Sequence, residues 1–209
     1  MTQHAQQMQA HPARDIDGVH TTMTPSVPFH PLPTPARAGK RWAGPVLGAA
    51  TVGTALMAGL FFAFDVAVMP GLGRGDDRTF VTAMQNINVA IENPVFFLAF
   101  FGALVLSGIA AFQQRRLGRR AVFGWVLGAV ALYAVALLVT MGTNIPLNNE
   151  LAKAGDPGRV RDLAAVRDKF EGTWVALNMV RTAACVLAVG CLSRALFLHG
   201  RGEAGAAGR

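Results

Sequence analysis

The chain has 209 residues, of which 52% are hydrophobic and only 15% are charged. This composition fits one small helical membrane domain and disfavours a water-soluble core. The net charge of +7 would suit a nucleic-acid-binding protein, but the basic residues are grouped between long apolar runs. We therefore expect them to meet anionic lipid headgroups, and we expect no nucleic-acid partner.

Residues 1–43 differ in composition from the rest of the chain. They contain six of the eleven prolines, four of the five histidines and few apolar residues. Nothing there can build a hydrophobic core, so we predict a disordered, Pro- and His-rich cytoplasmic tail. The scattered histidines could bind a metal weakly, but a solvated tail is the simpler interpretation. The first apolar run is too long for a secretory signal and should stay as a membrane anchor.

Four long apolar runs follow the tail and predict the fold. They cover about 44–69, 94–112, 121–141 and 174–197. Each is close to the roughly 20 residues that cross about 30 Å of hydrocarbon as a helix. The alternative is a soluble bundle of four buried helices, but runs this long and this poor in charge are rare in soluble domains. We therefore predict an all-α membrane protein, with a four-transmembrane-helix bundle over 44–198 and a short basic tail over 199–209.

The basic residues between the runs predict the orientation in the membrane. The N-terminal tail, the loop between the second and third runs and the end of the chain from Arg194 onward hold eleven Lys and Arg residues, against seven in the other two loops. The short Arg115–Arg120 cluster carries the strongest part of this bias. Because Lys and Arg concentrate in cytoplasmic loops, we predict a multi-pass protein of the inner (plasma) membrane with both termini cytoplasmic.

The two loops on the other side of the membrane are longer and partly apolar. In the first, amides surround several apolar residues, and we predict a short interfacial helix over 76–90, capped by Asp76 or Asp77. In the second, a charged stretch from Val160 to Phe170 has apolar residues at helical spacing. This spacing predicts a helix at the membrane surface.

Apart from Arg194 near the end of the fourth run, two charged residues interrupt the apolar runs. Asp65 lies near the end of the first run, and Arg181 lies inside the fourth. At about 1.5 Å of rise per residue, they lie roughly 7 Å and 10 Å below the same membrane face. A charge at that depth is costly and normally faces a protein interior or a water-filled cavity. These two residues are therefore the best indication of a site.

Polar side chains at the same level form helical stripes on the third and fourth helices. The stripes consist of Thr140, Asn144 and Asn148 on one helix and of Trp174, Asn178, Arg181 and Cys185 on the other. Two interpretations fit them. Either Asp65 and Arg181 pair and the asparagines tie the helix ends together, or these residues form a pocket open to the outer face. In the pocket, Asp65 or Glu92 would be a base and Arg181 would hold an anion.

The sequence gives no indication of a bound metal or cofactor. His199 is the one histidine outside the N-terminal tail, and it follows the last apolar run. We therefore expect no histidine-ligated haem or di-iron site within the bundle, and we find no P-loop and no CxxC redox pair. Cys185 and Cys191 lie on different faces of one helix, so we expect packing residues and no disulfide between them.

Four segments together resemble the anthrone-oxygenase-like integral membrane protein family, much of which is a domain of unknown function. The segments are GLFFAFDVAVMPGL (59–72), QNINVAIENPVFF (85–97), TNIPLNNEL (143–151) and TWVALNMVRT (173–182). The resemblance covers about 44–198 and implies a four-helix membrane fold. It also implies the activity assigned to a few members, the oxidation of anthrones to anthraquinones.

The resemblance marks individual positions of this chain. They are Pro70, Asn86, Asn88, Asn93, Pro94, Asn144, Pro146, Asn148, Trp174, Asn178 and Arg181. Two stretches depart from the family pattern. Leu177 and Met179 flank Asn178 where relatives often read Trp-Asn-His, which removes a possible histidine base. Asp65 stands where a small polar residue is commoner.

We therefore expect a membrane protein with a polar site at the outer face that oxidises an aromatic, polyketide-like substrate without a metal. An anthrone is acidic at its methylene carbon, so a base and a cation that stabilises the enolate could suffice for reaction with O₂. The expected catalytic residues are Asp65, Glu92 and Arg181. The expected ligand-binding residues are Asn86, Asn88, Asn93, Asn144, Asn148, Trp174 and Asn178.

A non-enzymatic protein is the alternative, and it would bind a lipid, a quinone-like ligand or a partner helix. A transporter is less favoured, because four helices without an internal repeat give little to alternate. Membrane lipids and a hydrophobic aromatic ligand are the expected partners, and an oligomer is compatible with the sequence.

The orientation can be tested with a reporter that is active only in the periplasm. Fused after Arg209, it should stay silent, because the distribution of Lys and Arg places both termini in the cytoplasm. The same reporter inserted directly after Pro157, between Asp156 and Gly158 in the loop predicted to be external, should be active. A strong signal from the C-terminal fusion would reverse the topology.

Overall fold

Residues 35–207 form helices joined by short connections in the computed structural model of this protein, which describes those residues and the side chains of 41–204. All of them belong to the compact unit Pro33–Arg209. The elements, in chain order, are α1 (Pro35–Ala63), η1 (Phe64–Val68), α2 (Met69–Leu72), α3 (Asp77–Ile91), α4 (Pro94–Arg116), α5 (Arg120–Val139), η2 (Thr140–Asn144), α6 (Ile145–Lys153) and α7 (Leu163–Ala207). The segments η1 and η2 are π-helical and continue the α-helices on either side of them.

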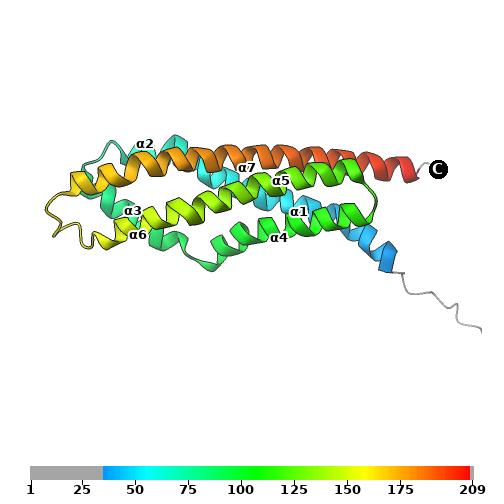
Figure 1. Ribbon diagram of the computed structural model, residues 1–209, viewed down its shortest axis with the longest axis horizontal. Helices are drawn as coiled ribbons and strands as arrows, with labels where there is room; N and C mark the ends of the chain where they lie inside the picture. The colour runs from blue at the N-terminus through cyan, green and yellow to red at the C-terminus, as the bar shows by residue number, and fades with distance from the viewer. Residues whose placement is uncertain (1–34, 208–209) are drawn as a thin grey trace, which may run out of the picture. The chain divides into compact units, whose positions relative to one another are not determined.

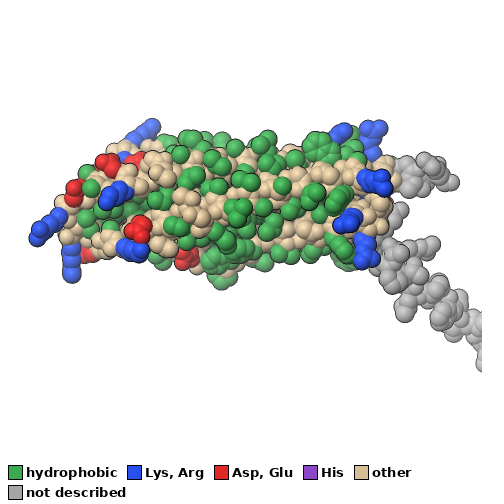
Figure 2. Space-filling model, viewed as in Figure 1, with side chains coloured by type: hydrophobic (Ala, Val, Ile, Leu, Met, Phe, Trp, Pro, Cys, Tyr) green, Lys and Arg blue, Asp and Glu red, His purple; other side chains and the backbone are tan. Residues whose placement is uncertain are grey.

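Four helical stretches are long and apolar enough to cross a membrane. Within the part of the chain that the structure describes, they are Arg41–Leu72, Pro94–Arg116, Arg120–Lys153 and Leu163–Ala204. Only 28–33% of the residues in the most apolar part of each are buried, so most of these apolar side chains keep some exposed surface. Figure 2 shows them covering the middle of the visible face, with charged side chains at both ends. The predicted all-helical, four-span membrane bundle is confirmed.

The four long helices pack through small side chains. α7 packs against α1 and α5, and α4 packs against the same two helices. A side chain on Gly53 of α1 would meet the Cβ atom of Ala103 of α4 at 3.4 Å, so the two backbones come close. Tyr133 of α5, which is buried, donates its hydroxyl to the carbonyl of Phe100 in α4 at 2.8 Å. Close backbones and a few interhelical hydrogen bonds are the usual means by which helices associate in lipid.

Several boundaries differ from the sequence prediction at the end of the bundle that holds the start of α1 and the end of α7. Residues 35–43, which were assigned to the tail, form the first turns of α1, because Pro35 is favourable at a helix start and most of the residues that follow are good helix formers. The rest of the predicted tail, 1–34, lies outside the described residues. Residues 199–207 continue α7, whose end is fixed by buried His199. The ring nitrogen Nδ1 of His199 lies 2.7 Å from Nη1 of Arg119 and 3.0 Å from Nε2 of Gln114.

The opposite end of α7 also differs from the prediction. A surface helix over 160–170 and a separate span from 174 were expected, but α7 is continuous from Leu163. Gly172 lies between the two, and a glycine costs only about 1 kcal/mol in a helix. Packing on both sides offsets that cost, since Phe170 and Trp174 are both buried against α1, α2, α3 and α6.

The short helix α3 agrees with the interfacial helix predicted over 76–90, and it is fixed firmly to α7. The Asp76 side chain caps it by accepting a hydrogen bond from the Thr79 backbone N–H at 2.7 Å. That bond lowers the pKa of Asp76 below its usual value. Arg167 of α7 donates to Asp77 and to the carbonyl of Gly75, each at 3.1 Å, and its guanidinium lies 4.5 Å from the centre of the Phe80 ring. α3 therefore covers the end of the bundle away from the last turns of α7, which we call the outer end (Figure 1).

Two prolines account for the π-helical segments. Pro70 follows η1 and Pro146 follows η2, each by two residues. A proline has no N–H to donate and its ring clashes with the carbonyl four residues earlier, here that of Val66 or Gly142. Each of those carbonyls lies inside a π-helical segment, where the helix widens to avoid the clash. Such segments are frequent at functional sites, and both contribute residues to the cavity described below.

Candidate functional site

A cavity of about 290 Å³ lies between α1, α3, α4, the η2 segment and α7. Much of its wall is aromatic and comes from Phe61, Phe64, Phe96, Phe97, Phe100, Phe101 and Trp174. Its polar residues are Asn88, Glu92, Thr140, Asn144, Asn148, Asn178 and Arg181. An apolar cavity with a few polar groups is the usual form of a small-molecule site.

Arg181 is the cation of this cavity, and it is only 6% exposed. Its guanidinium carbon lies 4.4 Å from the centre of the Phe61 ring and 5.3 Å from that of Trp174. It donates from Nη2 to Oδ1 of Asn178 at 2.6 Å and from Nη1 to the Thr140 hydroxyl at 3.3 Å. Two ring faces and two hydrogen bonds therefore stabilise the charge.

Asp65 compensates this charge through Asn178. The Nδ2 atom of Asn178 donates to Oδ1 of Asp65 at 2.5 Å and to the carbonyl of Phe61 at 2.8 Å. Thr182 donates to the other oxygen of Asp65 at 2.5 Å. Among the described residues, the direct Asp65–Arg181 ion pair considered above is replaced by this amide bridge. The reason is geometric, because Asn178 lies one turn before Arg181 on the same helical stripe and bonds to both groups.

Three buried polar atoms in residues that line the cavity have no partner among the described residues. They are Nδ2 of Asn88, Oδ1 of Asn144 and Nε of Arg181. They come from α3, η2 and α7, which converge only in the tertiary structure. A buried polar group without a partner costs roughly 1–3 kcal/mol, so native proteins rarely contain several in one place. Two donors and one acceptor at one cavity therefore indicate a place for a polar ligand or for ordered water.

Trp174 is held in place by residues of η2 and α6. Its Nε1 donates to Oδ1 of Asn148 at 2.9 Å, and its backbone carbonyl accepts from Nδ2 of Asn144 at 3.4 Å. The ring lies 5.4 Å from Phe64 and 6.0 Å from Phe170, measured between ring centres. The indole therefore forms a rigid part of the cavity wall.

The structure brings seven of the sequence-predicted site residues to this cavity. They are Asn88, Glu92, Asn144, Asn148, Trp174, Asn178 and Arg181. Glu92 is exposed at the end of α3, and its side chain bonds to no other described residue. Asp65 does not line the cavity and acts on it only through Asn178.

Two further predicted residues lie elsewhere. Asn93 caps α4, where its side chain accepts hydrogen bonds from the backbone N–H groups of Val95 and Phe96 at 3.1 Å and 3.0 Å. Asn86 lines a second, more open groove of about 510 Å³ at the outer end of the bundle. This outer groove shares Asn88, Glu92 and Asn148 with the cavity. Water can therefore approach the cavity from the outer groove.

The sequence analysis missed the phenylalanine wall. Phe96 and Phe100 are four residues apart, and so are Phe97 and Phe101. The two members of each pair therefore lie one above the other on the surface of α4. That repeat was a usable signal, although membrane helices are rich in phenylalanine for reasons of packing alone. Thr182, which holds Asp65, was also missed. No cluster of three or more His, Cys, Asp or Glu side chains that could hold a metal occurs among the residues described.

Residues 96–191 match the family model described as anthrone oxygenase. The predicted resemblance to anthrone oxygenases is therefore confirmed over this part of the chain, which begins in the first turn of α4 and ends within α7. No curated protein and no solved structure matches the chain.

Asn178→Ala should lower the free energy of unfolding by about 2–3 kcal/mol, because it removes partners from Arg181 and Asp65 at once. Asn149→Ala is the matched control. It makes the same change at an exposed amide outside the cavity and should cost less than about 0.5 kcal/mol. Reversible unfolding in mixed detergent micelles measures both. Equal stability of the two variants would show that the network contributes nothing to folding.

A double-mutant cycle tests the amide bridge itself. Arg181→Ala leaves the Asp65 carboxylate with less compensation, so adding Asp65→Asn should recover part of the lost stability. Because the coupling passes through Asn178, the interaction energy from this cycle should shrink when the cycle is repeated in the Asn178→Ala background. An interaction energy of the same size in both backgrounds would show that the two charges interact directly.

Proposed function

We propose that the cavity binds a flat aromatic molecule with oxygen substituents and supports its oxidation by O₂. The observation that carries this proposal is the set of three unpartnered polar atoms at one aromatic-walled cavity. Aromatic walls favour a flat ring system by stacking and edge contacts. The donors of Asn88 and Arg181 suit ligand carbonyl or hydroxyl oxygens, and the acceptor of Asn144 suits a ligand hydroxyl. A hydroxylated anthrone has all of these groups.

The size of the cavity supports a small ligand. Its volume of about 290 Å³ is at the lower end of the range for small-molecule sites. A compact ring system suits such a volume, whereas a complete two-chain lipid does not. Among the expected partners, an aromatic or quinone-like molecule is therefore favoured over a membrane lipid as the occupant of this cavity.

The chemistry needs a base, a site for negative charge and O₂. Glu92 takes a proton from the methylene carbon of the anthrone, and the negative charge moves to the carbonyl oxygen, where Arg181 stabilises it. The carbanion carbon then bonds to O₂, which is the oxidant, and a hydroperoxide forms after protonation. Loss of water breaks the O–O bond and the remaining C–H bond, which leaves a second carbonyl. One O₂ thus yields one quinone and one water.

The positions of Glu92 and Arg181 suit this series of reaction steps. In an anthrone, the methylene and the carbonyl lie on opposite sides of the central ring, so the base and the cation must come from different parts of the wall. Glu92 is the C-cap residue of α3, and Arg181 is on α7. Glu92 also borders the outer groove, through which it can return its proton to water. Asp65 has a positioning role, since it holds Asn178 and through it Arg181.

An oxidation assay tests the proposal. The protein in lipid nanodiscs should convert a dihydroxyanthrone to the anthraquinone in air faster than protein-free nanodiscs do. Arg181→Gln and Glu92→Gln should each lower the protein-dependent rate by at least about 10²-fold. Glu150→Gln is the matched control, because Glu150 is an exposed carboxylate outside the cavity, and it should retain the wild-type rate.

Binding can be followed separately from turnover. In a Trp42→Phe, Trp125→Phe variant the remaining indole is Trp174, which lines the cavity. Anthraquinone should quench its fluorescence in a saturable manner, and the quenching should weaken in Arg181→Gln. Saturable quenching without any protein-dependent oxidation would favour the non-enzymatic, quinone-binding alternative. The absence of both quenching and oxidation would overturn the enzymatic proposal and the non-enzymatic alternative.

A further inference from the structure

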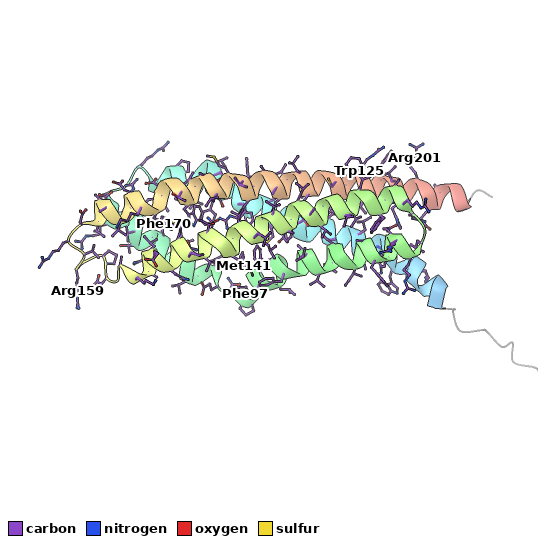
Figure 3. The ribbon with its side chains drawn as sticks, in the orientation of Figure 1. Phe97, Trp125, Met141, Arg159, Phe170 and Arg201 are labelled. Carbon is purple, nitrogen blue, oxygen red and sulfur yellow. The ribbon has the colours of Figure 1, made fainter. Side chains whose placement is uncertain are left out.

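The cavity has an apolar edge at the surface of the membrane-spanning region. Four of its lining side chains, Phe97, Phe101, Met141 and Ile145, are 39–50% exposed. All four lie within candidate spans. Figure 3 shows Phe97 on α4 and Met141 on the neighbouring helix at the same level of the bundle. In a membrane, this edge would contact the acyl chains of lipid.

The helices on the two sides of this edge are not packed together. Within the described chain, α4 packs against α1 and α5 but has no substantial contact with η2 or α6. Helix α5 packs against α4 and continues directly into η2 and α6, so this continuous helix separates from α4 where η2 begins. Phe97 and Phe101 on one side and Met141 and Ile145 on the other therefore border a lateral mouth.

The approach from water is different in character. The outer groove is lined by the amides of Gln85, Asn86, Asn88, Asn148 and Asn149 and by the carboxylates of Glu92 and Asp156. A ring system entering there would leave water and pass between hydrogen-bonding groups. At the lateral mouth it would meet only ring, thioether and aliphatic groups. A flat aromatic molecule also partitions from water into hydrocarbon, because the transfer removes its apolar surface from water.

We propose that the ligand enters the cavity from the membrane hydrocarbon. It passes between α4, which contributes Phe97 and Phe101, and the η2–α6 segment, which contributes Met141 and Ile145. The substrate class is then a lipid-dissolved, planar aromatic molecule with few polar substituents. The outer groove serves water and protons and does not admit the ring system. The nature of the ligand rests on the proposed function, whereas the lateral opening rests on the mouth residues alone.

The experiment uses Trp174 as the reporter and lipid as the probe. The Trp42→Phe, Trp125→Phe protein is reconstituted into phosphatidylcholine vesicles in which half of the lipid carries a dibrominated acyl chain, a contact quencher of indole. Phe97→Ala is then introduced to widen the mouth. Leu98→Ala is the matched control, because Leu98 is the next residue of α4, is also exposed and does not line the cavity.

Phe97→Ala should raise the quenching of Trp174 by brominated lipid about twofold, since it removes an aromatic side chain of roughly 150 Å² or more from the mouth. Leu98→Ala should leave the quenching unchanged. Both side chains are exposed, so both variants should keep the wild-type melting temperature and helical content.

Two results would overturn the lateral route. One is equal quenching in the Phe97→Ala and Leu98→Ala variants. The other is a larger effect of Phe97→Ala on quenching by aqueous acrylamide than on quenching by brominated lipid, which would indicate entry from water. The experiment contains neither anthrone nor turnover, so a failed oxidation assay and a failed lateral route remain distinguishable.

Discussion

One buried positive charge, that of Arg181, constrains the outer half of the bundle. A cation among apolar helices must be compensated, and here the compensation comes from three other helical elements. η1 supplies Asp65 by way of Asn178, η2 supplies the Thr140 hydroxyl, and α1 supplies the face of Phe61. Each partner fixes one helix relative to α7. The same contacts that stabilise the charge therefore set the positions of the cavity walls.

The two prolines provide the space that this arrangement needs. Pro70 and Pro146 widen the first and third helices at η1 and η2, which both lie beside α7. A regular helix in lipid would close against its neighbours through small side chains, as α1 and α4 do near Gly53. At the π-helical segments the helices instead present Phe64, Thr140 and Asn144 to a cavity. The loss of two backbone hydrogen bonds thus creates a site.

The cavity borders two different surroundings, the outer groove and the apolar surface of the membrane-spanning region. On one side, amides and Glu92 connect it to the outer groove, and on the other side Phe97 and Met141 connect it to the membrane region. Under the two proposals, a molecule dissolved in lipid would enter by one route, and protons would reach Glu92 from water by the other. If the proposed oxidation takes place here, this separation would keep most water away from the enolate while Glu92 exchanges protons through the outer groove.

Local pattern was enough to predict the four spans and the stripe from Trp174 to Cys185, because these depend on apolar length and on helical period, and it narrowed the cap of α3 to Asp76 or Asp77. The same period placed Asn178 and Arg181 on one face. It did not show that Asn178 would stand between Arg181 and Asp65, or that Asp65 would lie outside the cavity while Glu92 lay at its wall. Those facts depend on how η1, η2 and α3 are placed against α7. That placement follows from long-range contacts, such as Arg167 with Asp77 and Trp174 with Asn148, which no local pattern encodes.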